Sequence, residues 1–452
     1  MSTAALTGTE AIAAVATGAA SVTEIVAGCL DRTAELDGAI GAFHVLDEDG
    51  ARSAAKRLDA GIAGPLHGLV VGIKDVIDTA DLPTGYGSPL FEGHRPARDA
   101  EVVAALRRAG AIVLGKTEST EFAMYQPART RNPRDLGRTP GGSSSGSAAA
   151  VAAGMVPVAF GTQTAGSVIR PAAYCGVYGF KPTRGWISTA GIWRLSERLD
   201  TVGLFARSVA DLALVYQVLR RRTARSGNTA RSGHAVSKPT VAVLSAAEWG
   251  TCDGDVRDAL SCVADALSDH GWHVRDMSMP DSWRQLPEQH KVVMAAEVAR
   301  NLHASLGERV GHISEQARAV VEQGDRCRAV EYLAALEARD EARRALAPLA
   351  ATVDLVLTPS ALGVAPEGLD FTGDPVMGRP WTLLGLPAAN VPVFRRPDGL
   401  PAGVQFVGLR RDDLSYLHQL ALADAALGQS VLGQSVLGQG APTPGAAAPR
   451  KD

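Results

Sequence analysis

A run of three serines is the densest chemical signal in the sequence. It lies in TPGGSSSGSAAAVAAG (139–154), where Ser143, Ser144 and Ser145 stand in a glycine-rich turn before an alanine-rich segment. A flexible linker has a similar composition, although linkers are not normally followed at once by thirteen mostly apolar residues. A serine-rich turn at a helix start can also bind phosphate. The run alone therefore leaves a linker, a phosphate site and a catalytic turn open.

Two further segments carry groups that could work with these serines. GTQTAGSVIRP (161–171) places Ser167 among small residues, where a substrate carbonyl could approach the backbone and consecutive N–H groups could converge on an oxyanion. LVVGIKDVID (69–78) places Lys74 directly after five apolar residues. Alone, the first could be an ordinary turn and the second a surface lysine. Nucleophilic chemistry would need both segments, because a serine needs a proton acceptor and a buried lysine can be neutral enough to act as one, but the two segments alone leave these alternatives open.

Strands that alternate with helices are expected to position these turns. Short apolar runs are separated by Gly/Pro punctuation and alanine-rich pieces, which predicts an α/β fold. The predicted strands lie at 69–73, 111–114, 156–160 and 240–245, then in VDLVLTPS (353–360), AANVPVF and GVQFVGL. We expect the late strands to rejoin the sheet formed by the early ones, as a large α/β/α core around a mixed β-sheet.

Three regions are predicted along the chain. Two capping-box patterns, Thr7 with Glu10 and Ser21 with Glu24, predict a helical N-terminal segment, 1–60, packed on the core. The main domain is predicted to span 61–427, interrupted by a polar Gly/Ser-bearing connection at 224–237. Residues 428–452 contain part of a tandem LGQSV repeat and then a Pro/Ala/Gly-rich end with little apolar area to bury, which predicts a disordered tail.

Composition excludes several classes of protein. The 452 residues carry 45 Lys+Arg and 48 Asp+Glu, a net charge of −3, without the concentrated positive field that nucleic acid or a membrane surface would need. The 5 cysteines are scattered with no C-x-x-C pair, which argues against a disulfide framework. The first residues lack a secretory pattern, and no apolar stretch approaches the length of a membrane span. We therefore expect a cytoplasmic protein.

Three other features invite a functional interpretation that we consider the weaker one. GAIVLGKT (110–117) matches the phosphate-loop pattern around Lys116, but its intervening residues are strand-like, so the glycines are expected to bracket a strand. His270 and His273 lack a third ligand at metal-site spacing, and we expect no metal. Cys175 stands in an apolar stretch with no adjacent base, which predicts buried packing rather than a nucleophile.

The order of Lys74, GGSSSGS and TAGSxxRP resembles the amidase signature family of serine hydrolases. Further segments look like that family, among them GPLHGLVVGIKDVID, DAEVVAALRRAGAIVLGKTESTEFA, YCGVYGFKPTRGWIS, LDTVGLFARSVADLAL and GLPAGVQFVG, and the resemblance runs from about residue 5 to 425. It implies Ser167 as the nucleophile, Ser143 as a proton relay held by a cis peptide bond, and Lys74 as the base. Burial would have to lower the pKa of that lysine.

The resemblance also implies an oxyanion site. Its donors would be the backbone N–H groups of Thr164, Ala165, Gly166 and Ser167, and it places Ser144 in the same substrate-binding set. The sequence departs from the common Asp-Thr-Gly-Gly-Ser pattern here, with Gln163 first, Ala165 third, and Arg170 three residues after the nucleophile rather than two. Backbone donors survive such changes, but a substrate preference cannot be copied from the common pattern.

These observations predict an enzyme that hydrolyses a carboxamide to a carboxylate and ammonia or an amine. No cofactor is required, and the expected partner is a small-molecule amide, not nucleic acid or a membrane; a homodimer remains open. The first alternative is the glutaminase A-type subunit of a tRNA-dependent amidotransferase, which also resembles this signature. The Gln163/Ala165 variant and the repetitive C-terminus argue against it. The remote alternative is a nucleotide-binding protein that uses Lys116.

Overall fold

The computed structural model describes residues 6–61, 64–220, 238–393, 396 and 398–429. The predicted connection at 224–237 and residues 430–452 of the predicted tail lie outside this part of the chain.

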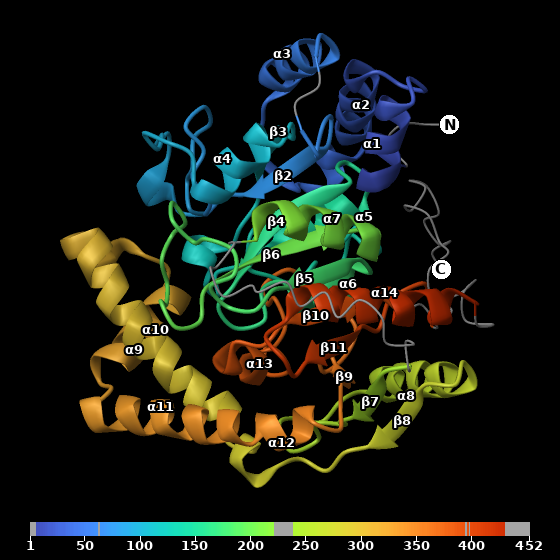
Figure 1. Cartoon of the computed structure of the whole chain (residues 1–452). Coiled ribbons are helices and arrows are strands. Elements are labelled where there is room, and N and C mark those ends of the chain that lie inside the picture. The colour runs from blue at the N-terminus through green and yellow to red at the C-terminus, as the bar shows by residue number, and fades with distance from the viewer. Residues whose placement is uncertain (1–5, 62–63, 221–237, 394–395, 397, 430–452) are drawn as a thin grey trace, which may run out of the picture.

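A single mixed sheet of 11 strands forms the centre of the fold (Figure 1), in the order β1-β3-β2-β4-β6-β5-β10-β11-β9-β7-β8. β2 runs parallel to β3 and β4, the pairs from β4 through β6, β5, β10 and β11 to β9 are antiparallel, and β7 runs parallel to β8 and β9. The strands are β1 (Phe43–Leu46), β2 (Val70–Lys74), β3 (Ile112–Thr117), β4 (Val158–Gln163), β5 (Tyr178–Lys181), β6 (Thr201–Ala206), β7 (Thr240–Val243), β8 (His273–Asp276), β9 (Leu355–Pro359), β10 (Ala388–Val391) and β11 (Val404–Gly408).

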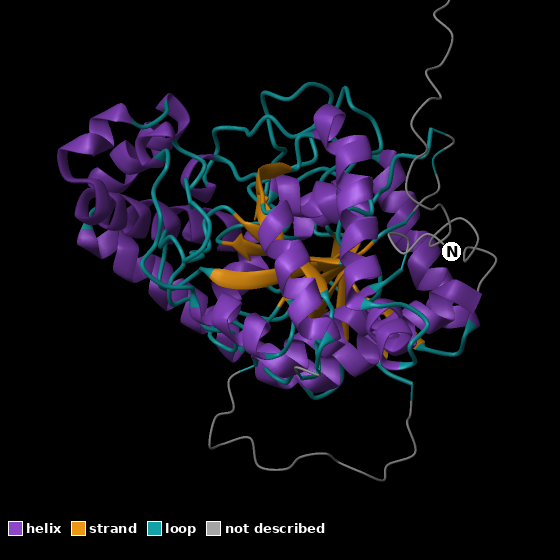
Figure 2. Ribbon diagram, turned by 90° about the horizontal axis from the view of Figure 1, so that it is seen from above, coloured by secondary structure: helices purple, strands orange, loops and turns teal. Residues whose placement is uncertain are grey.

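Helices surround this sheet, so the central strands are buried on both faces (Figure 2). They are α1 (Gly8–Ala16), α2 (Val22–Ile40), α3 (Glu48–Asp59), α4 (Glu101–Arg108), α5 (Ser145–Ala152), α6 (Ile169–Cys175), α7 (Val209–Leu219), α8 (Gly254–Asp269), α9 (Leu286–Leu306), α10 (Glu315–Asp325), α11 (Ala329–Arg344), α12 (Leu346–Ala350), α13 (Arg379–Leu384) and α14 (Asp413–Gln429). Short 3-10 helices lie at Pro89–Phe91, Glu121–Ala123, Asp281–Trp283 and Gly307–His312. The helices α9, α10 and α11 project together at one side of the molecule and are called the helical arm below (Figure 1).

The N-terminal segment is helical except for one strand. Both predicted capping boxes are present, at the starts of α1 and α2. The sequence predicted helix throughout 1–60, and this is wrong at Phe43–Leu46, which forms β1 and pairs antiparallel with β3. The reason is local: Gly41 ends α2 in the left-handed conformation, and the Asp37 carboxylate accepts the N–H of Ala42 at 2.6 Å, so the chain leaves the helix beside the open edge of β3.

The other strand predictions are confirmed. Each of the seven predicted runs overlaps a strand. The late strands β9, β10 and β11 join the sheet that the early strands form, through the pairing of β10 with β5. Strands β5, β6 and β8 were not predicted individually.

The strand interpretation of GAIVLGKT is also confirmed, although the second glycine, Gly115, lies inside β3 and does not mark its end. Lys116 lies within β3 with no exposed surface. Its ammonium donates to the Ile77 carbonyl at 2.8 Å and lies 3.5 Å from the Asp75 carboxylate. Burial lowers the pKa of Lys116 to about 8. A lysine held inside the sheet by protein groups is not available to a nucleotide phosphate.

Candidate active site

Lys74 is the last residue of β2 and is fully buried. Its Nζ donates to Ser143 Oγ at 2.7 Å and to Thr162 Oγ1 at 3.0 Å. β4 runs parallel beside β2, with Ile73 opposite Phe160, so Thr162 reaches Lys74 from the carboxyl end of the neighbouring strand. Burial away from water lowers the pKa of Lys74 well below its ordinary value, and the negative charge of Asp200 opposes that shift. The surface-lysine alternative is therefore wrong.

The serine run is a buried, fixed turn, not a linker. The Gly142–Ser143 peptide bond is cis, as the resemblance implied, and Ser143 is 1% exposed. The Gly142 carbonyl accepts a hydrogen bond from Arg170 Nη2 at 2.6 Å, and the Ser143 carbonyl accepts one from the Thr120 N–H at 3.2 Å. Ser145 Oγ donates to the Gly141 carbonyl at 2.8 Å. Ser143 is thus held on both sides with its hydroxyl toward Lys74.

Ser144 faces the backbone of β4 instead of a cavity. Its hydroxyl lies 3.3 Å from both the carbonyl oxygen and the nitrogen of Thr162, and the residue has no exposed surface. Ser144 therefore ties the serine run to the strand whose Thr162 side chain contacts Lys74. A direct contact between Ser144 and substrate stays a prediction.

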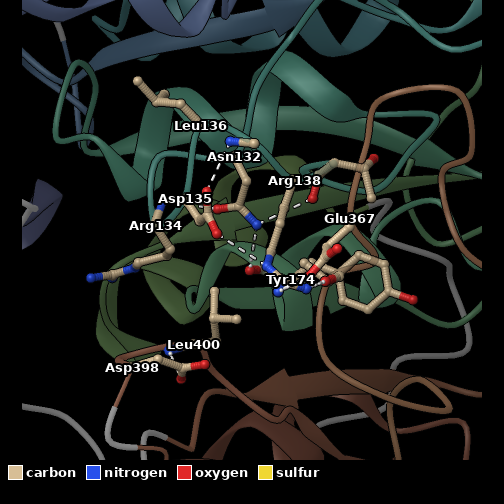
Figure 3. A network of polar contacts seen from close by, with 12 residues as sticks. Asn132, Arg134, Asp135, Leu136, Arg138, Tyr174, Glu367, Asp398 and Leu400 are labelled. Atoms are coloured by element: carbon tan, nitrogen blue, oxygen red, sulfur yellow. Dashed lines mark hydrogen bonds and ion pairs between the residues drawn. The ribbon is translucent and has the colours of Figure 1, made fainter. Parts of the chain in front are cut away.

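A network of polar contacts anchors the loop that precedes the serine run (Figure 3). Asn132 donates from its amide to the carbonyls of Thr139 at 3.2 Å and Tyr174 at 2.9 Å, and is fully buried. Arg138 donates to the Ala365 carbonyl at 2.8 Å and pairs with Glu367 at 2.8 Å. The network joins this loop to α6, which follows the turn that carries Ser167, so the two serine-bearing turns are held relative to each other.

The turn that carries Ser167 connects β4 to α6. Gln163, the last residue of β4, accepts the N–H groups of Val168 and Ile169 on its side-chain oxygen at 2.8 and 3.1 Å. This amide therefore takes up donors at the start of α6, as a capping side chain does. Ser167 is 8% exposed, and its hydroxyl makes no hydrogen bond within the described part of the chain, which leaves it free to meet a substrate.

The predicted oxyanion donors lie in the same turn. The backbone N–H groups of residues 164–167 have no protein acceptor among the described residues. The carbonyl groups of Thr164 and Ala165, by contrast, are both occupied by side chains, those of His290 and Thr382. The turn therefore offers N–H donors beside two carbonyl groups that are already hydrogen-bonded, which suits a negatively charged oxygen.

A cavity of about 190 Å³ lies beside the Ser167 turn and the strand that precedes it. Thr162 and Thr164 line it together with Asp200, the residues 192–197 and Ala123. Asp200 is half-buried and accepts hydrogen bonds from Thr164 Oγ1 at 2.7 Å and from the N–H groups of Leu195 and Ser196, each at 2.9 Å. Burial raises the pKa of Asp200 to about 6.

The structure brings Lys74 and Ser143 into direct contact and joins Ser144 to them through Thr162. Sequence reasoning missed Thr162, Asp200, His290 and Thr382 as parts of the site. Asp200 stands in the segment LDTVGLFARSVADLAL, which resembles the amidase signature family, so a signal existed for it. The other three carried no chemical pattern of their own.

The remaining weak candidates are resolved by their surroundings. Cys175 has no exposed surface, and burial raises the pKa of its thiol, which confirms packing and not nucleophilic chemistry. Within the described ranges, no three His, Cys, Asp or Glu side chains gather in a way that could hold a metal ion. No helix in the same residues is long and apolar enough to cross a bilayer.

Comparison with known proteins places this geometry in a family. The family model described as Amidase matches residues 24–417. The A-type subunit of glutamyl-tRNA(Gln) amidotransferase from Anaeromyxobacter dehalogenans (strain 2CP-C) is 34% identical over 464 residues, covering 89% of this chain and 92% of the relative. The solved structure of 6-aminohexanoate cyclic dimer hydrolase complexed with substrate matches at a TM-score of 0.83 and 25% identity, covering 96% of this chain and 100% of the other.

Native peptide amidase from Stenotrophomonas maltophilia is a further structural match, at a TM-score of 0.77 and 27% identity, covering 93% of this chain and 96% of the other. The family match spans most of the chain, and the structural likeness spans nearly all of it. The family motifs are the segments that carry Lys74, Ser143 and Ser167 in the site described above. The chain therefore belongs to the amidase signature family, enzymes that hydrolyse the carbon–nitrogen bond of amides.

Proposed function

We propose that this chain hydrolyses a small-molecule carboxamide through an acyl-enzyme on Ser167, with Ser143 as proton relay and Lys74 as base. The observation that carries the proposal is the fully buried contact of 2.7 Å between Lys74 Nζ and Ser143 Oγ. A surface lysine would be charged and solvated, whereas a buried one without a carboxylate in hydrogen-bond contact can be neutral and accept a proton.

The first half of the reaction forms the acyl-enzyme. Ser167 Oγ attacks the carbonyl carbon of the amide while its proton passes to Ser143 Oγ, and the Ser143 proton passes to neutral Lys74. The resulting oxyanion accepts hydrogen bonds from the backbone N–H groups of residues 164–167. When the C–N bond breaks, the leaving nitrogen takes a proton that returns from the Lys74 ammonium through Ser143, and the amine or ammonia departs.

The second half releases the acid. A water molecule attacks the ester carbonyl of acylated Ser167 and loses its proton to Lys74 through Ser143. The Ser167 oxygen then leaves and regains that proton. Lys74 is neutral again at the end, so each turnover consumes one amide and one water and yields one carboxylic acid and one amine or ammonia.

A glutaminase role is the second candidate, because the A-type amidotransferase relative is similar over most of both chains, 89% of this one and 92% of the relative. In that role the same machinery would act on glutamine and pass ammonia to a partner protein. The two candidates share the mechanism and differ in substrate and partner. A free-standing amidase is the one we favour, because Gln163 and Ala165 depart from the common pattern of the family at the oxyanion turn.

We also propose that the enzyme works in the cytoplasm. None of the five cysteines, all of which lie in the described ranges, forms a disulfide, which suits a reducing compartment.

Two measurements test the proposed function. Ammonia release from a panel of aliphatic, aromatic and amino-acid amides, with glutamine among them, should identify turnover and separate the two candidates. Labelling with a fluorophosphonate, followed by peptide mass spectrometry, should place the adduct on Ser167. Ser167→Ala should lose activity by about 10⁶-fold, as in other serine nucleophiles, while keeping its melting temperature. An adduct on Ser143 or Cys175 would overturn the assignment of the nucleophile.

A further inference from the structure

Two side chains outside the proposed catalytic set hold the carbonyl groups of the nucleophile turn. His290, on α9, has its Nε2 2.8 Å from the Thr164 carbonyl oxygen. Thr382, on α13, donates from its hydroxyl to the Ala165 carbonyl oxygen at 2.9 Å, and that hydroxyl also lies 3.0 Å from the Gly378 carbonyl. Both side chains are buried, and they come from segments more than a hundred residues beyond the turn.

Because the peptide bond is planar, a contact that fixes a carbonyl group also fixes the direction of the N–H group that follows it. In a trans peptide, the C=O and the following N–H point in opposite directions. The Thr164–Ala165 and Ala165–Gly166 bonds are trans, since the cis bond described is Gly142–Ser143. Holding the Thr164 carbonyl toward α9 therefore turns the Ala165 N–H away from α9, and holding the Ala165 carbonyl toward α13 turns the Gly166 N–H away from α13.

We propose that His290 and Thr382 are positioning residues, which aim the N–H groups of Ala165 and Gly166 at the oxyanion of the reaction. This inference rests on the proposed function, because it assigns these N–H groups the same role. The proposal also explains why the donors stay in place while charge develops on the substrate oxygen. The turn is short and rich in small residues, and two side chains from distant helices fix its peptide planes.

The protonation state and the hydrogen bonds of His290 fit a positioning role better than a role in core packing alone. Burial lowers the pKa of His290 to about 3, so the imidazole is neutral at working pH. A neutral ring facing a carbonyl with Nε2 must carry its hydrogen there, which makes it a donor to Thr164. Its Nδ1 then has no hydrogen-bond partner in the described structure. A buried acceptor without a donor costs stability, so core packing alone would favour an apolar side chain at this position.

α13 supports the turn by shape as well as by hydrogen bonding. A Cβ added at Gly378, which caps the N-terminus of α13, would lie 2.8 Å from both the Ala165 carbonyl oxygen and the Gly166 Cα. The Gly378 backbone itself has a φ of −94°, which any residue can adopt. A methyl group there would therefore push on the turn without straining its own backbone. Thr382 also accepts the Gln163 amide at 3.0 Å, which joins α13 to the side chain at the start of α6.

The test compares variants that remove each contact with variants that keep it. His290→Leu and Thr382→Val should lower kcat by about 10- to 100-fold, the scale expected when catalytic groups are displaced, and leave KM within about twofold. His290→Gln and Thr382→Ser retain a donor and should recover most of that loss. Gly378→Ala should lower kcat by steric displacement. Thr358→Val, which removes a buried hydroxyl without a partner, and Gly38→Ala, which meets nothing within 4 Å, are the matched controls.

A second measurement separates donor geometry from general damage. An aldehyde analogue of the best amide forms a tetrahedral adduct that uses the same donors, so its affinity should fall by the same factor as kcat in His290→Leu and Thr382→Val. The carboxylic acid product should bind these variants as well as the wild type. Melting temperatures should stay close to the wild-type value in both controls. They should also change little in His290→Leu, because this substitution removes one unpaired buried acceptor, Nδ1, and leaves another, the Thr164 carbonyl.

Three results would overturn the inference: kcat within twofold of wild type in both His290→Leu and Thr382→Val, losses that Gln and Ser fail to restore, or equal weakening of product and aldehyde. If either variant does not fold, the other and Gly378→Ala decide the outcome by the same criteria. Failure of the proposed function would be visible separately, because wild-type Ser167 would then not be labelled by fluorophosphonate.

Discussion

At the scale of single residues, the burial of Lys74 suits the role of base that we propose for it. The side chain has no exposed surface, and its hydrogen-bond partners are two hydroxyls, those of Ser143 and Thr162. Hydroxyls can accept from an ammonium or donate to a neutral amine, so they accommodate both states that proton transfer requires. A carboxylate in the same place would have fixed the charge and prevented the lysine from accepting a proton.

Substitutions of Lys74 should separate proton transfer from charge. Activity of the wild type should rise with pH through the lowered pKa of Lys74, because only the neutral amine accepts a proton. Lys74→Arg keeps the charge but cannot lose its proton, and should cost about 10²- to 10⁴-fold in kcat/KM, as should Lys74→Ala. The measurement is a pH profile of kcat/KM, with exposed Lys56→Arg as the control. Near-normal activity of Lys74→Arg would rule out the Lys–Ser–Ser mechanism.

The charge of Asp200 should also affect the pH dependence of kcat/KM. Above a pH of about 6 this half-buried carboxyl is ionised, and its charge raises the pKa of Lys74 against the effect of burial. Asp200→Asn keeps an acceptor for the Leu195 and Ser196 N–H groups but removes the charge, so the pKa of Lys74 should fall further. The rising limb of the pH profile should therefore move to lower pH. The exposed Asp269→Asn should leave it in place, and a shift toward higher pH would contradict this account.

At the scale of elements, β1 and α5 meet at a glycine beside the serine run. Gly146 lies in the first turn of α5 and donates its N–H to the Glu118 carbonyl at 3.0 Å. A Cβ at this position would lie 2.1 Å from the Ala42 carbonyl oxygen and 2.4 Å from the Glu118 nitrogen. Both are backbone atoms, so neither can move aside without moving β1 or the segment after β3. The close approach explains why a glycine follows the three serines at this position.

Gly146→Ala should therefore be costly. Forcing a methyl group into well-packed backbone should reduce the free energy of unfolding by about 3 kcal/mol, at the upper end for overpacking. It should also lower kcat, because Ser143 stands three residues before the displaced position. Thermal unfolding and amide hydrolysis measure the two effects. Gly38→Ala in α2, where nothing lies within 4 Å, should instead raise stability slightly. An unchanged melting temperature in Gly146→Ala would contradict the packing described here.

At the scale of the whole molecule, the helical arm is fastened to the wall of the cavity through Glu297. This residue of α9 is 2% exposed and accepts hydrogen bonds from Ser196 Oγ at 2.5 Å, Arg198 Nη1 at 3.1 Å and Tyr332 OH at 2.6 Å. Ser196 lines the cavity, and Tyr332 lies on α11. A single carboxylate thus joins two helices of the arm to the segment that ends at Asp200.

Loss of this carboxylate should loosen the cavity wall without abolishing chemistry. Glu297→Ala leaves the hydroxyls of Ser196 and Tyr332 without their partner and should cost about 3 kcal/mol of stability. KM should rise because the 192–197 wall is no longer held, whereas fluorophosphonate should still label Ser167. Limited proteolysis, thermal unfolding and steady-state kinetics check these outcomes. The matched control is Glu322→Ala, an exposed acid of α10. If Glu297→Ala kept the wild-type KM and melting temperature, the arm would have no role in shaping the cavity.

The sequence by itself determined the local features of this protein. Apolar runs between Gly/Pro signals located the strands that carry Lys74 and precede Ser167, and side-chain capping patterns located the first two helices. These signals are local, because a strand or a cap depends on residues within a few positions of each other. The order of the lysine and the two serine-bearing turns, matched to a family pattern, then pointed to amide hydrolysis.

Only the tertiary structure decided which groups meet. β1 escaped prediction because its formation depends on the open edge of β3, more than 60 residues away in the chain. Thr162, His290 and Thr382 carry no chemical pattern of their own, and these residues and Asp200 meet only when the sheet and the helices α9 and α13 pack around the turn that carries Ser167. The lowered pKa of Lys74 belongs to the same class of property, since a pKa depends on the burial and the charges that the whole fold places around the group.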